Sequence, residues 1–349
     1  MSKKGQSRMG IVLALVLAIA MVLVGFVPAV CSAEKLPKLN LKAAQSMMPR
    51  DSTTHKELME MCEAITKRTG GKVTWKFYGP EIGDWTELQR MCMKGMVDLQ
   101  FNAFDSGLDA RWNILYLPFL VASWDEARKV YSEGGPFDEI GTQWAADGKL
   151  QYLGTWLNAL GSVTLNHDPV SNAVQAKGVK IRCPPLEIFK CYVEKMGFDT
   201  VTLPYAEVGV GLSTGVVDGL VGVGAVNIYK DFRDLARTMI VTYELCESWA
   251  ITANLKRWNS LPKAYQKIFQ EEANRIRAKH LTIIEKEEME YQQKLKDKGW
   301  TIVNMKKDHP KELKIWIDNC RQCWDVLEST VGKKWMDLLK KRLSELGVM

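Results

Sequence analysis

One arginine, at the end of a predicted strand, has the chemistry to bind an anion. Residues 178–185 read Gly-Val-Lys-Ile-Arg-Cys-Pro-Pro, so apolar residues alternate with Lys180 and Arg182. Alternation predicts a short strand, and the proline pair ends it. Ligands of α/β sheets bind near strand ends, where a guanidinium can hold both oxygens of a carboxylate. The plainer alternative is that Arg182 is solvated or forms a structural ion pair.

No set of residues in the sequence forms a catalytic or metal-binding pattern. The four histidines, His55, His167, His280 and His309, do not have metal-ligand spacing. The sequence has no Gly-x-Ser-x-Gly, no phosphate-binding Gly-Lys-Ser/Thr and no dinucleotide fingerprint. We therefore expect a protein that is not an enzyme and that needs no metal or cofactor. An exported enzyme with an unrecognised nucleophile is the alternative.

Beyond Cys31, an odd number of cysteines follows, which cannot all pair within one chain. They are Cys62, Cys92, Cys183, Cys191, Cys246, Cys320 and Cys323. We expect most of them to be free, buried thiols. Cys320 and Cys323 have the spacing of a redox motif, but they lie in a run with helical apolar spacing, which favours core thiols.

Periodicity and turn residues predict an α/β protein. The predicted strands are 39–45, 73–78, 95–102, 150–156, 178–183, 200–203, 216–223 and 300–303. The predicted helices are 54–69, 85–94, 186–197, 206–215, 263–298 and most of 309–346, with another helix opening at 123–126. Alternating strands and helices near the start predict a largely parallel sheet. Residues 241–254 are expected to cross back between two domains.

Two features bear on the domain plan. The junction Met93–Leu99, Met-Lys-Gly-Met-Val-Asp-Leu, resembles the junction Ser213–Gly219, Ser-Thr-Gly-Val-Val-Asp-Gly, which indicates two domains of related design. The helix at 263–298 is long enough to run across both domains like a strap. A coiled coil is the alternative, but the apolar seam is not a clean heptad. We expect domain I at 34–158 plus 248–287, and domain II at 159–247 plus 288–349.

The first 33 residues read as a secretory signal. A basic start precedes an apolar run over 11–27, and Cys31, Ser32 and Ala33 supply small residues for cleavage near Ala33. An uncleaved membrane anchor and a lipid attached to Cys31 are alternatives. The signal carries three of the six net positive charges, and the remaining +3 does not suggest nucleic-acid binding. We expect an exported, periplasmic protein.

The sequence resembles the substrate-binding proteins of tripartite ATP-independent periplasmic (TRAP) transporters, a family that includes dicarboxylate- and sialate-binding proteins. The resemblance covers nearly all of the mature chain, and the order and spacing of several motifs carry it. These are Tyr-Gly-Pro-Glu-Ile-Gly at 78–83, Gly-Met-Val-Asp at 95–98, Leu-Pro-Phe-Leu at 117–120, Lys-Gly-Val-Lys-Ile-Arg at 177–182, Leu-Ser-Thr-Gly-Val-Val-Asp-Gly at 212–219 and Trp-Asn-Ser-Leu-Pro at 258–262.

The resemblance implies a fold, a site and a partner. The fold is the periplasmic solute-binding-protein fold, with two α/β domains around a cleft and a long helix spanning both. The family's strand-end arginine, which pairs with the ligand carboxylate, falls on Arg182, and its aromatic wall falls on Tyr205. The other implied ligand-binding residues are Ser46, Met48, Asn102, Phe104, Trp156, Asn158, Gly222 and Trp249. The implied partners are the small and large permease subunits in the membrane, and we expect the binding protein itself to be a monomer.

Two departures from the family pattern affect the ligand. Many relatives have a second arginine or polar residue shortly after the position of Gly161, where this chain has Ser162 and Val163. A ligand-touching asparagine of relatives falls in 220–224, where this chain has Leu-Val-Gly-Val-Gly; Asn227 is a candidate substitute. The pocket is therefore expected to be less polar and to bind an aromatic or apolar monocarboxylate or a 2-oxo acid. A small sulfonate ligand, a ligand sensor and a binding protein of an ATP-driven transporter are the alternatives.

Overall fold

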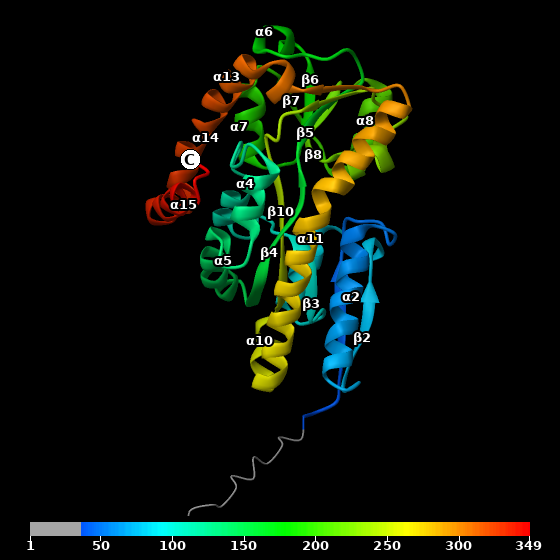
Figure 1. Ribbon diagram of the computed structural model, residues 1–349, viewed down its shortest axis with the longest axis vertical. Coiled ribbons are helices and arrows are strands. Elements are labelled where there is room, and N and C mark those ends of the chain that lie inside the picture. The colour runs from blue at the N-terminus through cyan, green and yellow to red at the C-terminus, as the bar shows by residue number, and fades with distance from the viewer. Residues whose placement is uncertain (1–35) are drawn as a thin grey trace, which may run out of the picture. The chain divides into compact units, whose positions relative to one another are not determined.

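The structure, a computed structural model, describes residues 36–349, and two β-sheets organise this range (Figure 1). The predicted signal sequence and Cys31 lie outside the described residues. The first sheet contains, in spatial order, β2 (Val73–Tyr78), β1 (Leu39–Gln45), β3 (Leu99–Ala103), β10 (Cys246–Asn254) and β4 (Leu150–Leu160). The second contains β11 (Thr301–Asn304), β9 (Thr238–Val241), β5 (Ser162–Leu165), β8 (Gly219–Val223), β6 (Lys180–Cys183) and β7 (Asp199–Thr202).

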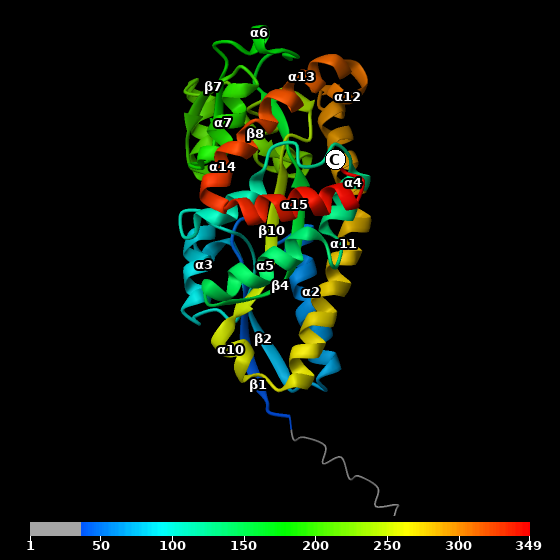
Figure 2. The same cartoon turned by 90° about the vertical axis from the view of Figure 1, so that its left-hand side faces the viewer.

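Helices connect and cover the strands (Figure 2). Up to β4 they are α2 (Thr53–Arg68), η1 (Pro80–Ile82), α3 (Trp85–Met93), η2 (Ala110–Tyr116), α4 (Trp124–Tyr131) and α5 (Pro136–Asp147). Between β5 and β9 they are α6 (Ala173–Ala176), α7 (Glu187–Lys195), η3 (Tyr205–Glu207), α8 (Val208–Thr214), α9 (Ala225–Asn227) and η4 (Ile228–Phe232). After β10 they are α10 (Leu255–Ser260), α11 (Lys263–Asp297), α12 (Met305–Asp308), α13 (Pro310–Arg321), α14 (Cys323–Val331) and α15 (Lys333–Glu345). The α/β fold and the long helix are confirmed, whereas α5 was not expected from the sequence.

Both sheets are mixed, which differs from the largely parallel sheet that the sequence predicts. Strands β1, β2 and β3 are parallel, as are β6, β7 and β8. Each sheet also holds an antiparallel strand, β10 in the first and β5 in the second. The reason is the route of the chain. It leaves the first sheet through β4 and β5, with only Gly161 between them, and returns through β10.

The predicted repeat between the two halves is present at atomic detail. The backbone N–H of Lys42 donates to Asp98 Oδ2 at 2.8 Å, and the N–H of Lys180 donates to Asp218 Oδ2 at 2.9 Å. Gly95 and Gly215, three residues before these aspartates, have φ angles of 75° and 74°, which glycine adopts without strain. Each aspartate therefore ties the start of one strand to the strand beside it in the same way.

We expect Asp98→Ala and Asp218→Ala to destabilise the protein, because each removes a hydrogen bond from a backbone N–H to a carboxylate. Such bonds contribute about 1.5–3 kcal/mol. Asp98→Ala is expected to cost more, since Asp98 also accepts from Arg257 Nε at 2.8 Å. Urea unfolding of both variants measures how much free energy of unfolding each substitution removes. Equal losses, or a larger loss for Asp218→Ala, would contradict this reading of the repeat.

The long helix α11 packs against parts of both sheets. It contacts α2 and β4 at the first sheet, and α9, η4 and β11 at the second. Its surface is largely charged, and no helix among residues 36–349 is long and apolar enough to cross a membrane. The strap prediction is consistent with these contacts.

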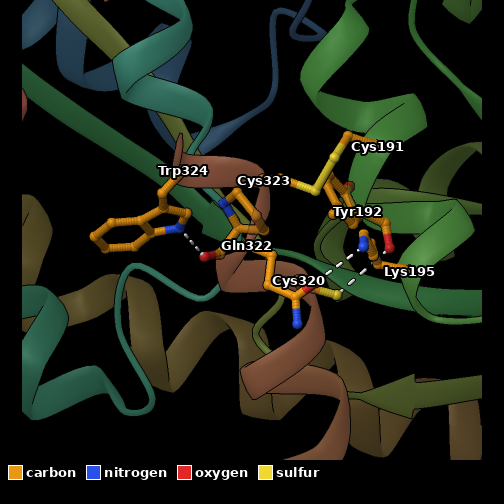
Figure 3. Close-up of a disulfide and its surroundings, with 8 residues drawn as sticks. Cys191, Tyr192, Lys195, Cys320, Gln322, Cys323 and Trp324 are labelled. Atoms are coloured by element: carbon orange, nitrogen blue, oxygen red, sulfur yellow. Dashed lines mark hydrogen bonds between the residues drawn. A yellow bond between two sulfur atoms is a disulfide. The ribbon is translucent and has the colours of Figure 1, made fainter. Parts of the chain in front are cut away.

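The cysteines follow the prediction except at one pair. Cys62, Cys92, Cys183, Cys246 and Cys320 are free and buried. Cys191 of α7 and Cys323 of α14 form a disulfide (Figure 3). The expectation that Cys323 is a free core thiol is therefore wrong. Cys320 and Cys323 share no bond, because α7 brings Cys191 to Cys323, while Cys320 Sγ lies 3.4 Å from the carbonyl oxygen of Tyr192. Spacing within one segment could not reveal this partner 132 residues away.

Candidate functional site

Arg182 is a buried guanidinium with no acidic partner. It lies on β6, is only 4% exposed, and donates from Nε to the carbonyl oxygen of Leu203 at 2.9 Å. Among residues 36–349, no aspartate or glutamate oxygen lies within 4.0 Å of it, and its two Nη atoms make no hydrogen bond. Burial lowers its pKa to about 10, which leaves it charged at neutral pH. A buried charge without a partner is costly, so this group is suited to a bound anion.

Tyr205 lies against Arg182. It opens η3 directly after Pro204, and its ring centroid is 5.7 Å from the guanidinium carbon, within range of a cation–π contact. Its hydroxyl donates to Asp231 Oδ2 at 2.7 Å. Burial raises the pKa of Tyr205 well above its ordinary value, and Asp231 and then Glu247 raise it further, while Arg182 lowers it. The predicted aromatic neighbour of the arginine is therefore in contact with it.

Gly222 lies at a position where a Cβ would come too close to neighbouring side chains. Its φ of 78° disfavours any other residue, and a Cβ there would lie 2.9 Å from atoms of both Leu245 and Phe189. Its backbone N–H donates to Glu244 Oε1 at 2.9 Å. Any larger residue at position 222, asparagine included, would therefore need the Leu245 and Phe189 side chains to move.

Ser46 and Asn102 bind one another at the ends of β1 and β3. Ser46 Oγ donates to Asn102 Oδ1 at 2.9 Å, and Asn102 Nδ2 donates to the carbonyl oxygen of Trp85 at 2.7 Å. Both residues are buried. Asn102 stands four residues after Asp98, as Gly222 stands four after Asp218, so the repeat places these two predicted site residues at equivalent strand positions.

Met48 and Asn158 surround a small cavity beside α11. Asn158 Oδ1 accepts from Thr54 Oγ1 at 3.0 Å, and Met48 Sδ lies 3.9 Å from Asn158 Nδ2 and 3.7 Å from Asn227 Nδ2. The cavity is about 10 Å³, which is room for about one water molecule. Asn227, a candidate substitute in the sequence, does reach this group, and Thr54 was not expected there.

The three remaining predicted residues are aromatic and almost fully buried. Phe104 stacks on Trp112 with ring centroids 3.7 Å apart. Trp156 stacks on His280 at 3.9 Å, and its Nε1 is buried without a partner. Trp249 pairs with Trp156 across β10 and β4. Phe104 and Trp156 thus contact residues outside the predicted set.

Glu247 is a polar residue that the sequence reasoning missed. It lies on β10 opposite Ala159, and its Oε2 is buried with no hydrogen-bond partner. Burial raises its pKa to about 7, opposed by the neighbouring Asn158 and Trp249 side chains. The signal in the sequence was a charged residue inside an otherwise uncharged run over 245–254.

Glu288 of α11 is a buried carboxyl that lines the small cavity beside Met48 and Asn158, whereas Glu247 does not line it. Its Oε2 accepts from the backbone N–H of Ala225 at 2.7 Å. Burial raises its pKa to about 8, from an ordinary value of 4.5, and Glu247 raises it further. The carboxyl groups of Glu247 and Glu288 therefore hold their protons more tightly in the folded protein than in the unfolded chain.

The raised pKa values of Glu247 and Glu288 predict a pH-dependent stability. The two carboxyl groups contribute fully to the free energy of unfolding below about pH 4.5. This contribution is lost as the pH rises through about 7 for Glu247 and about 8 for Glu288. We expect the unfolding temperature of the unliganded protein to fall between pH 5 and pH 8, and to fall less steeply in Glu288→Gln. Scanning calorimetry across this range compares the slopes, and parallel profiles for the two proteins would contradict the assignment.

A larger cavity than the one beside Met48 and Asn158 lies elsewhere in the described chain. It has a volume of about 240 Å³ and is lined by residues that include Trp124, Arg128, Tyr243, Glu285 and Lys306. None of the predicted site residues lines it. No group of three histidine, cysteine, aspartate or glutamate residues within 36–349 could hold a metal ion. We base the candidate site on Arg182, because its charge lacks a partner.

Sequence comparison identifies the family. Residues 44–329 match the profile of DctP, bacterial extracellular solute-binding protein, family 7. The chain belongs to this family. Its members are transport proteins that bind solutes outside the cytoplasm, not enzymes.

Curated relatives are distant. A solute-binding protein of Chromohalobacter salexigens is 26% identical over 207 residues, which is 57% of each chain, so this chain matches little more than half of that relative. The sialic acid-binding periplasmic protein SiaP of Vibrio cholerae is 20% identical over 252 residues, covering 69% of this chain and 76% of SiaP.

Solved structures share the fold. A TRAP periplasmic solute binding protein of Haemophilus influenzae superposes with a TM-score of 0.79 at 20% identity, covering 88% of this chain and 99% of the other. One from Desulfovibrio salexigens superposes with a TM-score of 0.80 at 18% identity, covering 89% and 99%. The predicted solute-binding-protein fold is therefore confirmed.

Proposed function

We propose that this family 7 protein captures a small organic acid through Arg182 and delivers it to the small and large permease subunits of a TRAP transporter. The observation that carries the proposal is the buried guanidinium whose Nη atoms have no partner within residues 36–349. A carboxylate on these atoms would supply the missing counter-charge and two parallel hydrogen bonds.

Ligands bound to structural relatives support an acid as the ligand. The Haemophilus influenzae protein was solved with L-gulonate, the Desulfovibrio salexigens protein with orotic acid, and a Chromohalobacter salexigens protein with D-glucuronate. Each of these ligands carries a carboxylate. Within this class we propose an aromatic or apolar monocarboxylate or a 2-oxo acid, because Ser162 and Val163 stand where many relatives have a second arginine or polar residue. A small sulfonate is the alternative ligand, because its oxygens can also accept hydrogen bonds from the Arg182 guanidinium.

The proposed cycle is opening and closing of two domains, 34–158 plus 248–287 and 159–247 plus 288–349, about the crossings at Gly161 and Thr242–Leu245. The Gly161 N–H donates to the carbonyl oxygen of Leu245 at 2.7 Å, so the two crossings touch. We further propose that the protein acts as a periplasmic monomer, with its signal removed near Ala33.

Mass spectrometry of small molecules released from the purified protein tests this function. We expect a carboxylic acid to be released, and we expect it to raise the unfolding temperature when added back. A ligand at 100 times its Kd adds about 2.7 kcal/mol to the free energy of unfolding. A thermal-shift screen of monocarboxylates, 2-oxo acids and sulfonates then ranks the classes. A protein that responds only to neutral or cationic compounds would contradict the proposal.

A further inference from the structure

Glu247 differs from Glu244 and Glu288 in having one carboxylate oxygen, Oε2, that is buried without a hydrogen-bond donor within residues 36–349. Glu288 accepts from the N–H of Ala225, and Glu244 accepts from the N–H of Gly222 and from Thr242 Oγ1. Glu247 Oε2 accepts from nothing among residues 36–349, and no lysine, arginine or histidine nitrogen there lies within 4.0 Å of the carboxylate. A buried carboxylate oxygen without a donor is costly to keep, and structural glutamates are normally hydrogen-bonded.

The position of Glu247 on β10 is fixed by the sheet. Its strand partner is Ala159 of β4, and the register shifts between Glu247 and Ser248. The flanking residues Cys246 and Ser248 are buried. A register shift of this kind changes the direction in which a side chain points, and such irregularities are frequent near functional sites. Glu247 is therefore held by a rigid strand rather than by a loop.

The neighbours of Glu247 belong to the candidate site. Asn158 and Trp249 lie close enough to lower its pKa by hydrogen bonding, and both are predicted ligand-binding residues. Tyr205 lies against Arg182, with its ring centroid 5.7 Å from the guanidinium carbon, and the charge of Glu247 raises the pKa of the Tyr205 hydroxyl. Glu247 and Arg182 do not form an ion pair with each other. The candidate site thus holds a guanidinium without an acidic partner and a carboxylate oxygen without a donor within residues 36–349.

We propose that Glu247 accepts a hydrogen bond from an amino or hydroxyl group of the ligand whose carboxylate binds Arg182. The inference rests on the proposed role of Arg182. Of the two ligand classes proposed above, it keeps the aromatic or apolar monocarboxylates and sets aside the 2-oxo acids, and it narrows the monocarboxylates to those that also carry a hydrogen-bond donor, such as 2-amino and 2-hydroxy acids. Such a ligand satisfies both unpaired groups at once. A 2-oxo acid offers only acceptors, and above its pKa of about 7 an ionised Glu247 cannot donate to them. The binding experiments are therefore run at about pH 8, where most of Glu247 is ionised.

Matched ligand series test this role by titration calorimetry on the full purified protein. The probes are the 2-amino, 2-hydroxy, 2-oxo and unsubstituted forms of 4-methylpentanoate and of 3-phenylpropanoate. We expect the wild type to bind the 2-amino or the 2-hydroxy form at least tenfold more tightly than the 2-oxo and unsubstituted forms. A 2-amino preference identifies an ammonium as the donor, and a 2-hydroxy preference identifies a hydroxyl.

The variant Glu247→Leu, which has no acceptor, is expected to lose most of that preference while still binding the unsubstituted acid. Glu247→Gln keeps a neutral acceptor and is expected to lose part of it. Glu207→Gln is the matched control, because Glu207 is an exposed glutamate two residues after Tyr205, and it should keep the preference. The inference is overturned if the wild type binds the 2-oxo or unsubstituted form as tightly as the donor-bearing forms, if it binds no member of either series, or if the preference survives both Glu247 variants.

Failure of this inference can be separated from failure of the proposed function. In Arg182→Met every carboxylate in the series should weaken together. If they do, and the wild type nevertheless shows no donor preference, Arg182 remains the anchor and only the role of Glu247 is wrong. If Arg182→Met binds all forms as the wild type does, the proposed function itself is wrong.

Discussion

Replacing Arg182 with methionine is expected to lower the affinity for carboxylate ligands by roughly 100-fold or more. Two charge-assisted hydrogen bonds would be lost, and hydrogen bonds to charged groups contribute about 1.5–3 kcal/mol. The unfolding temperature of the unliganded variant should stay the same or rise. The reason is that the wild-type guanidinium is buried without an acidic partner in the described chain, and removing it removes a desolvation cost.

Titration calorimetry and thermal unfolding of the same preparations measure the two effects. Arg182→Lys is the informative second variant, because lysine keeps the charge but cannot present two parallel N–H donors. We expect its affinity to fall between those of the wild type and Arg182→Met. An Arg182→Met protein that is strongly destabilised without ligand would instead indicate that Arg182 has a structural role.

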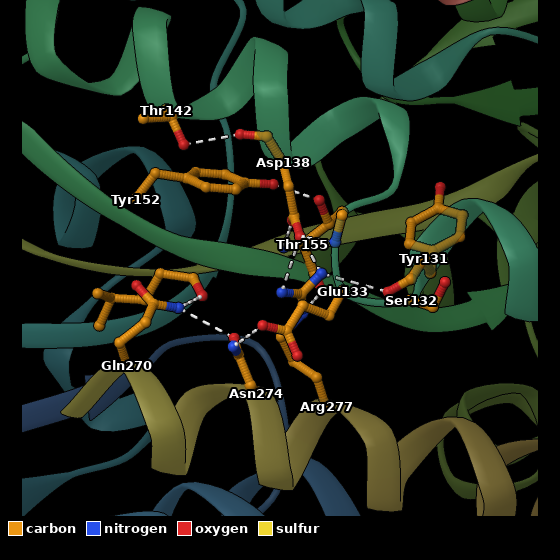
Figure 4. A network of polar contacts seen from close by, with 12 residues as sticks. Tyr131, Ser132, Glu133, Asp138, Thr142, Tyr152, Thr155, Gln270, Asn274 and Arg277 are labelled. Carbon is orange, nitrogen blue, oxygen red and sulfur yellow. Dashed lines mark hydrogen bonds and ion pairs between the residues drawn. The ribbon is translucent and has the colours of Figure 1, made fainter. Parts of the chain in front are cut away.

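Replacing Arg277 with methionine is expected to destabilise the fold by about 3–5 kcal/mol, because it removes one partner of a buried ion pair. Arg277 of α11 is 4% exposed and donates from Nη2 to Asp138 Oδ1 at 2.8 Å and from Nε to the carbonyl oxygen of Thr155 at 2.8 Å (Figure 4). It thereby joins α11, α5 and β4. Gly154 leaves the space for it, since a Cβ there would lie 2.1 Å from Arg277 Nη1.

Chemical denaturation measures this loss, with Lys294→Met as the matched control on the same helix. Lys294 pairs with Glu290 at 2.7 Å on the exposed surface, and surface pairs contribute about 0–1 kcal/mol. We expect ligand affinity to change little in either variant under conditions where the protein is folded. Similar losses of stability for Arg277→Met and Lys294→Met would show that the buried network does not anchor α11.

Local signals in the sequence were sufficient for much of the fold. Alternation between Gly71 and Gly79 predicted β2 with the bounds it has, and a serine before an apolar helical run is a typical N-cap, as Ser52 is for α2. The Ser52 side chain accepts from the His55 N–H. The repeat at Asp98 and Asp218 was visible as a seven-residue pattern, because the same hydrogen bond constrains both turns.

Features that depend on contacts between distant segments could not be read from the sequence. The antiparallel place of β10 depends on the route of the chain between two sheets, and the Cys191–Cys323 disulfide depends on the packing of α7 against α14. Helix α5 opens with Gly135 and Pro136, which read equally well as a turn. Each of these was decided by tertiary structure rather than by local preference.

The candidate site could be predicted only in part, because some of its features also depend on contacts between distant segments. Strand periodicity and a family resemblance pointed to Arg182 and Tyr205, which do lie in contact. Glu247 was missed, because a lone acidic residue in a strand carries no motif. Only the structure shows that one oxygen of its carboxylate, Oε2, has no hydrogen-bond donor within residues 36–349. Unpaired charges are properties of the folded environment, so they mark a site only once the neighbours are known.

Binding of the co-purified acid compared with its primary amide tests the role of Arg182 most directly. The amide keeps the size and the apolar surface of the ligand but removes the negative charge. With the wild-type protein in a calorimeter, we predict tight binding of the acid and at least 100-fold weaker binding of the amide. An amide that binds as tightly as the acid would contradict the claim that Arg182 recognises a carboxylate.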